Sequence, residues 1–198
     1  WIEALGAPVA SRDTGNELTS GVRFDPEGLT RTLAEAAGDV RLETPVSELP
    51  EGAQLILATG GFGASRELLR ERVTDQADHV LLRAAPGSTG DGLRLGLAAG
   101  GAPSDGLSEV YARAMPAPPA RVRPADFVTL SQLYARHAEV IGADGERHRT
   151  TTWSEIDTGQ WLVRRPGARA SFRVAESALR QRVRERSVGS MVDAAERA

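Results

Sequence analysis

Two glycine-rich turns carry the residues whose types and spacing suit ligand chemistry. The first, TGGFG at residues 59–63, directly follows the apolar run LILA at 55–58. The second, STGDG at residues 88–92, comes about thirty residues later. Glycine lets the backbone turn sharply and approach a ligand closely. Backbone N–H groups at such a turn can bind a phosphate or a ribityl chain. The turns are therefore the candidate binding elements.

The segments around these turns predict strand-turn-helix units. An apolar run without alternation, as at 55–58, is typical of a strand buried on both faces of a parallel sheet. Ser65 can cap a helix over 66–72. The second turn follows a short apolar run at 80–82 and leads into a helix over about 91–99. Plain N-capping of that helix by Ser88 or Thr89 is the structural alternative to ligand binding.

The N-terminal part of the chain supports an α/β fold. Asp25-Pro26 gives a strong helix start, because the carboxylate can cap and proline suits the first helical position. Gly38 ends that helix, and alternation at 40–43 predicts a brief strand. Helix, strand, connection, strand and helix in this order fit a βαβ architecture with a parallel sheet.

The second half of the chain differs in composition. MPAPPARVRP, residues 115–124, cannot hold regular secondary structure and predicts a boundary or crossing between domains. Beyond it we expect strands at 127–133 and 138–141, a hairpin turn at 142–145, and mostly helix from residue 171 onward.

Composition excludes several classes of function. The 198 residues are 40 % apolar, which is enough for a real core. Net charge is −3, so no overall attraction to nucleic acid or anionic membrane is expected. Cysteine is absent and all 24 basic residues are arginine, which removes thiolate, Schiff-base and P-loop chemistry. No apolar run approaches the roughly 20 residues that span a bilayer. We expect a soluble, cytoplasmic protein without a membrane span.

The sequence gives little support for other kinds of functional site. No G-x-S-x-G elbow supports a serine nucleophile. His79, His137 and His148 lack partners at metal-ligand spacing, so no metal site is predicted. The arginines between 164 and 186 are interleaved with acids and lack aromatic stacking partners along the predicted helix. They predict a solvated face rather than a nucleic-acid surface.

Read together, ATGG followed by TGDG at this spacing resembles the superfamily of FAD-dependent fumarate reductases, succinate dehydrogenase flavoproteins and 3-ketosteroid dehydrogenases. The resemblance implies that both turns face the FAD. It assigns cofactor contacts to Ala58, Thr59, Gly60, Gly61, Thr89, Gly90 and Asp91. Glycine backbone can reach a dinucleotide without steric conflict, and a carboxylate accepts hydrogen bonds from sugar or ribityl hydroxyls.

A third match is the hairpin IGADGERHR, residues 141–149, which resembles the family's V-N-x-x-G-x-R-F. Just before this hairpin the fumarate and succinate enzymes carry an arginine that donates a proton or clamps a carboxylate. Tyr134 stands at that position here, with Arg136 two residues on and on the same face of a predicted strand. The resemblance makes Arg136 and Tyr134 the candidate catalytic residues.

The predicted architecture is a fragment of an α/β flavoprotein. The family's upstream G-x-G-x-x-G and its late glycine-rich segment are not in the sequence, so weak FAD binding by the chain alone is expected. We expect part of a Rossmann-like FAD-binding domain at 1–107 and part of an α+β substrate-capping domain at 108–198. The implied function is hydride transfer between flavin and a carbon next to a carbonyl or carboxylate of a dicarboxylate-like or ketosteroid-like substrate. The alternatives are a non-catalytic binding module on the same scaffold and a nicotinamide-dependent enzyme.

Overall fold

The computed structural model describes all residues except 14–19, 51, 53–54 and 150–154. The chain forms two compact units, residues 1–47 and residues 48–198. Both candidate glycine turns and both candidate catalytic residues belong to the second unit.

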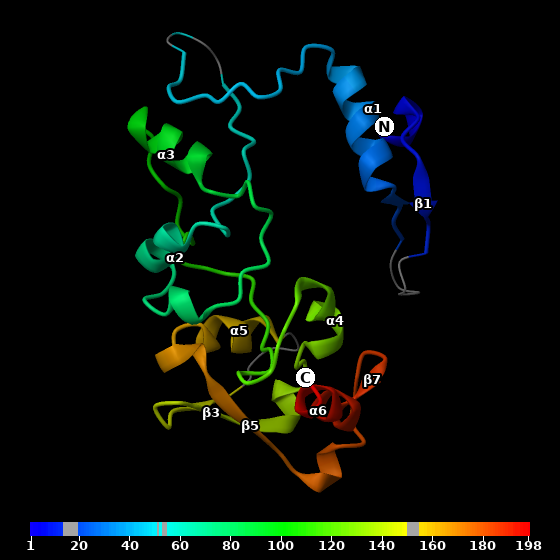
Figure 1. The fold of residues 1–198 in the computed structure, drawn as a ribbon, viewed down its shortest axis with the longest axis vertical. Coiled ribbons are helices and arrows are strands. Elements are labelled where there is room, and N and C mark those ends of the chain that lie inside the picture. The colour runs from blue at the N-terminus through cyan, green and yellow to red at the C-terminus, as the bar shows by residue number, and fades with distance from the viewer. Residues whose placement is uncertain (14–19, 51, 53–54, 150–154) are drawn as a thin grey trace. The chain divides into compact units, whose positions relative to one another are not determined.

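The first unit is a helix beside a short strand pair (Figure 1). A 3₁₀ turn, η1 (Glu3–Leu5), precedes the antiparallel strands β1 (Val9–Ser11) and β2 (Arg23–Phe24). Helix α1 (Pro26–Ala37) begins as predicted, because an Asp25 carboxylate oxygen accepts the N–H of Gly28 at 2.6 Å. The predicted strand at 40–43 is wrong: that segment has no regular structure, and Leu42 is 79 % exposed.

The second unit opens with the glycine-turn segments and three short helical elements. These are α2 (Arg66–Arg72), the 3₁₀ turn η2 (Ala77–His79) and α3 (Asp91–Ala98). Ser65 caps α2 as predicted, since its hydroxyl accepts the N–H of Leu68 at 3.3 Å. The strands predicted at 55–58 and 80–82 are wrong. No described strand pairs with either segment, and Ile56 is 94 % exposed.

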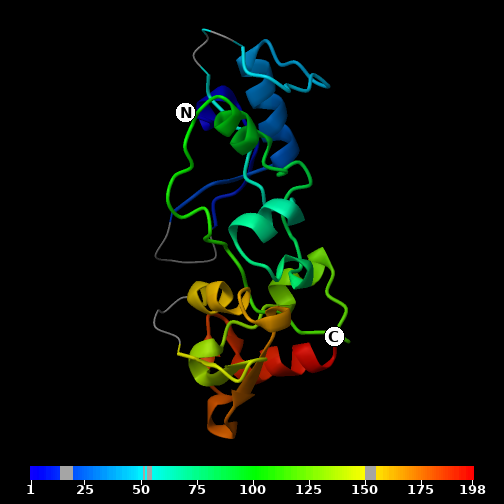
Figure 2. The ribbon, with the colours of Figure 1, turned by 90° about the vertical axis from the view of Figure 1, so that its left-hand side faces the viewer.

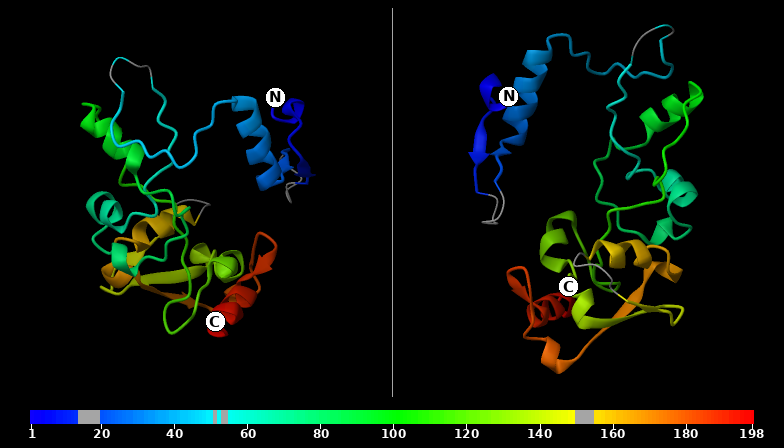
Figure 3. Two further views of the ribbon diagram at one scale, coloured as in Figure 1. Left: turned by 45° about the horizontal axis from the view of Figure 1, so that its top comes forward. Right: turned by 180° about the vertical axis from the view of Figure 1, so that it is seen from behind.

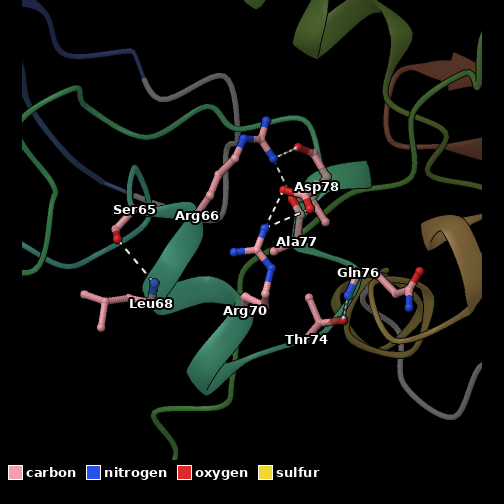
Figure 4. A network of polar contacts seen from close by, with 9 residues as sticks. Ser65, Arg66, Leu68, Arg70, Thr74, Gln76, Ala77 and Asp78 are labelled. Carbon is pink, nitrogen blue, oxygen red and sulfur yellow. Dashed lines mark hydrogen bonds and ion pairs between the residues drawn. The ribbon is translucent and has the colours of Figure 1, made fainter.

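Two arginines of α2 fix the turn that follows it (Figure 4). Arg66 donates to the carbonyl oxygen of Ala77 at 2.5 Å. Arg70 binds both carboxylate oxygens of Asp78 at 2.7 and 2.8 Å and so lowers the pKa of Asp78. These contacts hold η2 against α2, and thereby the start of the segment that leads to the second glycine turn.

The rest of the second unit combines short helices with two small antiparallel sheets. Its elements are η3 (Pro124–Asp126), α4 (Phe127–Leu130), η4 (Ala135–His137), β3 (Ala138–Gly142), β4 (Arg147–His148), α5 (Ile156–Leu162), η5 (Pro166–Ala168), β5 (Ala170–Val174), η6 (Glu176–Ala178), β6 (Arg182–Val183), β7 (Arg186–Ser187) and α6 (Val188–Glu196). The larger sheet has the order β4-β3-β5, and β6 and β7 form a hairpin that runs into α6 (Figure 3).

The β4-β3-β5 sheet buries one face. Val140 pairs with Phe172 on β5 and with His148 on β4, so these three side chains share that face. Phe172 packs on the core of Leu133, Tyr134, Val188 and Met191, and α5 lies over the sheet (Figures 1 and 2). The opposite face is mostly polar: it carries ion pairs of Glu139 with Arg147 and Arg173, beside the half-buried Ile141. Half-buried alternation of this kind is typical of antiparallel sheets.

The structure corrects part of the predicted second half. The strand at 138–141 and the turn after it are confirmed, with Gly145 at φ +82°. The strand predicted at 127–133 is wrong, because residues 127–130 form α4 and the rest is irregular. From 171 onward only α6 is helical over more than one turn, since β5 pairs with β3 and residues 182–187 form a hairpin.

As a whole the described residues form helices with small antiparallel sheets; a parallel sheet is not among them. Segments on both sides of residue 107 pack together. The Thr74 hydroxyl donates to the carbonyl oxygen of Val163 at 2.7 Å, and the N–H of Gly167 donates to the side-chain oxygen of Gln76 at 2.7 Å. The division at 107/108 into cofactor and capping domains stays a prediction.

Candidate functional site

The two glycine turns lie against each other. The N–H of Ala64 donates to the carbonyl oxygen of Ser88 at 2.9 Å, and the N–H of Gly90 donates to that of Gly61 at 3.2 Å. A third bond runs from the N–H of Gly92 to the hydroxyl oxygen of Thr59 at 3.1 Å. Segments about thirty residues apart therefore build one local structure, while the prediction that both turns face FAD stays a prediction.

Thr59 caps the helix that the second turn begins. Gly92 is the second residue of α3, and its N–H is one of the donors that a helix leaves without an internal partner. The predicted caps are wrong: neither Ser88 nor Thr89 caps α3, and the residue at the N-cap position is Gly90. The hydroxyl that satisfies Gly92 comes instead from the first turn.

Glycine is required at two positions where the turns meet. Gly90 has φ +86°, and a Cβ there would lie 2.3 Å from Cδ1 of Leu68 and 2.9 Å from Cβ of Phe62. A Cβ on Gly92 would lie 2.2 Å from the Thr59 hydroxyl oxygen. By contrast, a Cβ on Gly61 or Gly87 would meet nothing within 4 Å. The turns are therefore packed tightly where they touch and open toward solvent elsewhere.

The open side offers what an anionic dinucleotide needs. Ala58, Thr59, Gly60 and Gly61 are exposed. Among the described residues, the backbone N–H groups of Thr59, Gly60 and Gly61 have no hydrogen-bond partner. They lie next to the N-terminus of α3, where the helix dipole favours negative charge. These residues fit a phosphate-bearing cofactor.

Thr89 and Asp91 occupy the edge of the second turn. The carbonyl oxygen of Thr89 accepts a hydrogen bond from Arg94 at 2.9 Å. The Asp91 carboxylate is exposed and lies 3.3 Å from the same guanidinium. Exposed ion pairs of this kind contribute little to stability, so the Asp91 oxygens stay accessible to a ligand hydroxyl.

The candidate catalytic residues are placed differently from the prediction. Tyr134 and Arg136 do not share the face of a strand, because Tyr134 precedes η4 and Arg136 lies inside it. Tyr134 is only 5 % exposed and packs edge-on against Phe172 with 5.7 Å between ring centroids. Burial, with a smaller contribution from Glu196, raises the pKa of Tyr134. Arg136 is exposed.

A second aromatic pair lies on the hairpin that resembles the family's third motif. His148 stacks on Trp161 of α5 with 4.9 Å between ring centroids and 25° between the planes. Its Nε2 is buried and has no hydrogen-bond partner in the described part of the chain. Burial lowers the pKa of His148, and Asp157 offsets this in part. The neutral imidazole is therefore the form that this packing favours.

Two further features bear on the kind of site. Across the described residues, no group of three or more His, Cys, Asp or Glu side chains is arranged to hold a metal ion. None of the helices described is long and apolar enough to cross a membrane.

Sequence reasoning missed one cluster of charged and aromatic side chains. Arg83, Arg113 and Phe127 come from three segments and meet around the Phe127 ring. No spacing in the sequence relates them, because cation–π contacts between distant segments leave no local pattern.

Comparison with known families agrees with this geometry. Residues 19–184 match the family described as FAD binding domain. The match spans most of the chain and both glycine turns, and the chain belongs to this family. The domain binds FAD, and the proteins that carry it are in general flavin-dependent oxidoreductases. No curated protein and no solved structure matches the chain.

Proposed function

We propose that this chain is part of a flavin-dependent oxidoreductase that transfers hydride between FAD and a carbon next to a carbonyl or carboxylate. The observation that carries the proposal is the contact between the two glycine turns in a chain that belongs to the FAD binding domain family. FAD, when bound, supplies the hydride chemistry. The reaction would resemble that of fumarate reductases or 3-ketosteroid dehydrogenases.

The chain's own contribution begins with binding. The open N–H groups of Thr59, Gly60 and Gly61 would hold phosphate or ribityl oxygens of the cofactor, and Asp91 would accept a hydrogen bond from a hydroxyl. Ala58, Thr89 and Gly90 would complete the contact surface. The Thr59 hydroxyl is already bound to Gly92, so its role toward the cofactor is to position the second turn.

Arg136 or Tyr134 would handle the proton and the developing negative charge. Arg136 is exposed and positive, which suits a clamp on a carboxylate. Tyr134 keeps its proton, because its pKa is raised by burial, which suits a donor toward a ketone. Residues 1–107 would belong to the cofactor domain and 108–198 to the capping domain.

Binding is tested on the complete translation product of the reading frame that contains these residues. We expect it to purify with a yellow flavin chromophore, and a nicotinamide or no cofactor would contradict the proposal. Gly61→Val places a side chain on the open side and should lower flavin occupancy without lowering stability. Gly87→Val, at an equally open position outside the proposed contacts, is the matched control.

The reaction is tested with fumarate and a reduced dye, and with a 3-ketosteroid and an oxidising dye. Turnover of one of these substrate classes is the expected result; turnover of neither by the flavin-loaded protein would contradict the proposed chemistry. Comparing Arg136→Gln with Tyr134→Phe assigns the proton-handling role, because only the variant that lacks the acting group loses turnover.

A further inference from the structure

Two arginines share one aromatic ring in the second unit. The guanidinium carbon of Arg83 lies 4.2 Å from the centroid of the Phe127 ring, and that of Arg113 lies 5.5 Å from the same centroid. Arg83 comes from the segment that leads into the second glycine turn, Arg113 precedes the proline-rich segment, and Phe127 opens α4. Three segments far apart in the sequence thus bring two positive charges to one place.

Neither arginine has an acidic partner in the described part of the chain. Arg113 donates from Nε and Nη2 to the Tyr111 hydroxyl oxygen at 2.9 and 2.6 Å. Arg83 has no hydrogen bond or ion pair with any residue described. Its guanidinium instead lies over the Phe127 ring. Asp126 is adjacent to Phe127, but Arg123 already binds both of its carboxylate oxygens, at 2.9 and 3.0 Å.

A third guanidinium adds to the positive charge around α4. Arg186 donates from Nη1 to the carbonyl oxygen of Val128 at 3.0 Å and likewise has no carboxylate within ion-pair distance among the described residues. Burial lowers the pKa of Arg186, which reflects incomplete hydration of its charge. Like charges that approach one another in a partly dry environment destabilise the fold unless a counter-charge is present.

The guanidinium groups of the cluster indicate which kind of anion could balance their charge. A guanidinium presents parallel N–H donors that match the oxygens of a carboxylate or a phosphate. The Phe127 ring contacts both guanidinium groups through its face. The N–H groups of Arg83 have no partner among the described residues, and Arg113, whose Nε and Nη2 donate to Tyr111, keeps its Nη1 N–H groups for a ligand. Arg83 and Tyr111 are exposed, Tyr111 at 62 %, which gives a small ligand access.

We propose that Arg83 and Arg113, positioned by Phe127, form a binding site for a small oxyanion, either a carboxylate or a phosphate. The site does not depend on the proposed FAD contacts, since none of its residues belongs to them. Arg83 precedes the second glycine turn, and Arg113 and Phe127 belong to the predicted capping region, so the site would bring an anionic group into this part of the second unit.

The proposal is tested by calorimetric titration of the complete protein, prepared without FAD, with succinate and with inorganic phosphate at constant ionic strength set by chloride. We expect saturable binding of at least one anion. Arg83→Gln and Arg113→Gln should each weaken it by about tenfold, the value of one charge-assisted hydrogen bond. Arg31→Gln is the matched control, because Arg31 is an exposed arginine paired with Glu27 in α1.

Each possible result either identifies the anion that the site binds or overturns the proposal. Tighter binding of succinate assigns the site to a carboxylate, and tighter binding of phosphate assigns it to a phosphate. No saturable binding, or equal affinity in wild type and Arg83→Gln, overturns the proposal. Should Arg113→Gln fail to fold, Arg83→Gln alone decides, since Arg83 makes no hydrogen bond that folding needs. Failure here leaves the flavin test untouched, because no FAD is present.

Discussion

Gly90 is the residue at which the two glycine turns depend most on the absence of a side chain. Its positive φ strains any other residue, and a Cβ would collide with Leu68 of α2. We therefore expect Gly90→Ala to lower the free energy of unfolding by about 1–3 kcal/mol, measured by urea titration. Gly87→Ala is the control, because its Cβ would meet nothing within 4 Å and its φ is not positive. Equal stability of the two variants would contradict this account of the turns.

His148 makes stability depend on pH in a predictable direction. Burial of the ring lowers its pKa in the folded chain, whereas the unfolded chain binds a proton with the ordinary pKa near 6.5. Because the unfolded state then takes up more protons, stability falls as pH drops through 6.5. We expect the midpoint of thermal unfolding to be lower at pH 5.5 than at pH 7.5. In His148→Phe, which keeps an aromatic ring against Trp161, that pH-dependent loss should be smaller; an unchanged loss would assign it to other groups.

At the scale of elements, the cap of α3 shows how the turns are joined. Thr59→Val keeps the shape of the side chain but removes the acceptor for Gly92, which should cost about 0.5–2 kcal/mol. Hydrogen exchange of the Gly92 amide should speed up, and Thr59→Ser should restore most of the protection. A protected Gly92 amide in Thr59→Val would show that the hydroxyl is not what holds the helix start.

The same helix shows what sequence could and could not predict. Asp25 and Ser65 cap the helices that they directly precede, so the chain order alone revealed them. The cap of α3 comes from a residue 33 positions away, and only the fold brings it near. Strand predictions were wrong for a related reason, because a strand forms only where it finds a partner. β5 pairs with β3, whereas the apolar run at 55–57 has no partner among the described residues and stays exposed. Apolar patterning identifies a segment that can pair, but not whether a partner is present.

In the candidate site, too, the local features could be predicted from the sequence and the non-local ones could not. The two glycine turns could be recognised in the sequence because each is a contiguous motif. Their mutual contact is a finding of the structure, and their placement against FAD stays a prediction from the resemblance. The placement of Tyr134 and Arg136 was not predicted correctly, because the prediction assumed a strand where the chain forms a 3₁₀ turn. The Arg83, Arg113 and Phe127 cluster lay beyond prediction altogether, since its three members share no local pattern.

At the scale of the whole molecule, the division into two compact units predicts that damage to one core stays local. Met191 is fully buried in the core of the second unit, beside Leu133, Tyr134 and Val188. Met191→Ala removes buried apolar volume and should lower the stability of that unit by about 2–5 kcal/mol. Hydrogen exchange should then accelerate in β3, β5 and α6, while the amides of α1 keep their wild-type rates because their protection comes from contacts inside the first unit. Asp25→Ala is the converse variant: it removes the cap of α1 and should speed exchange there and not in β3. Simultaneous acceleration in both units by either substitution would mean that they unfold as one.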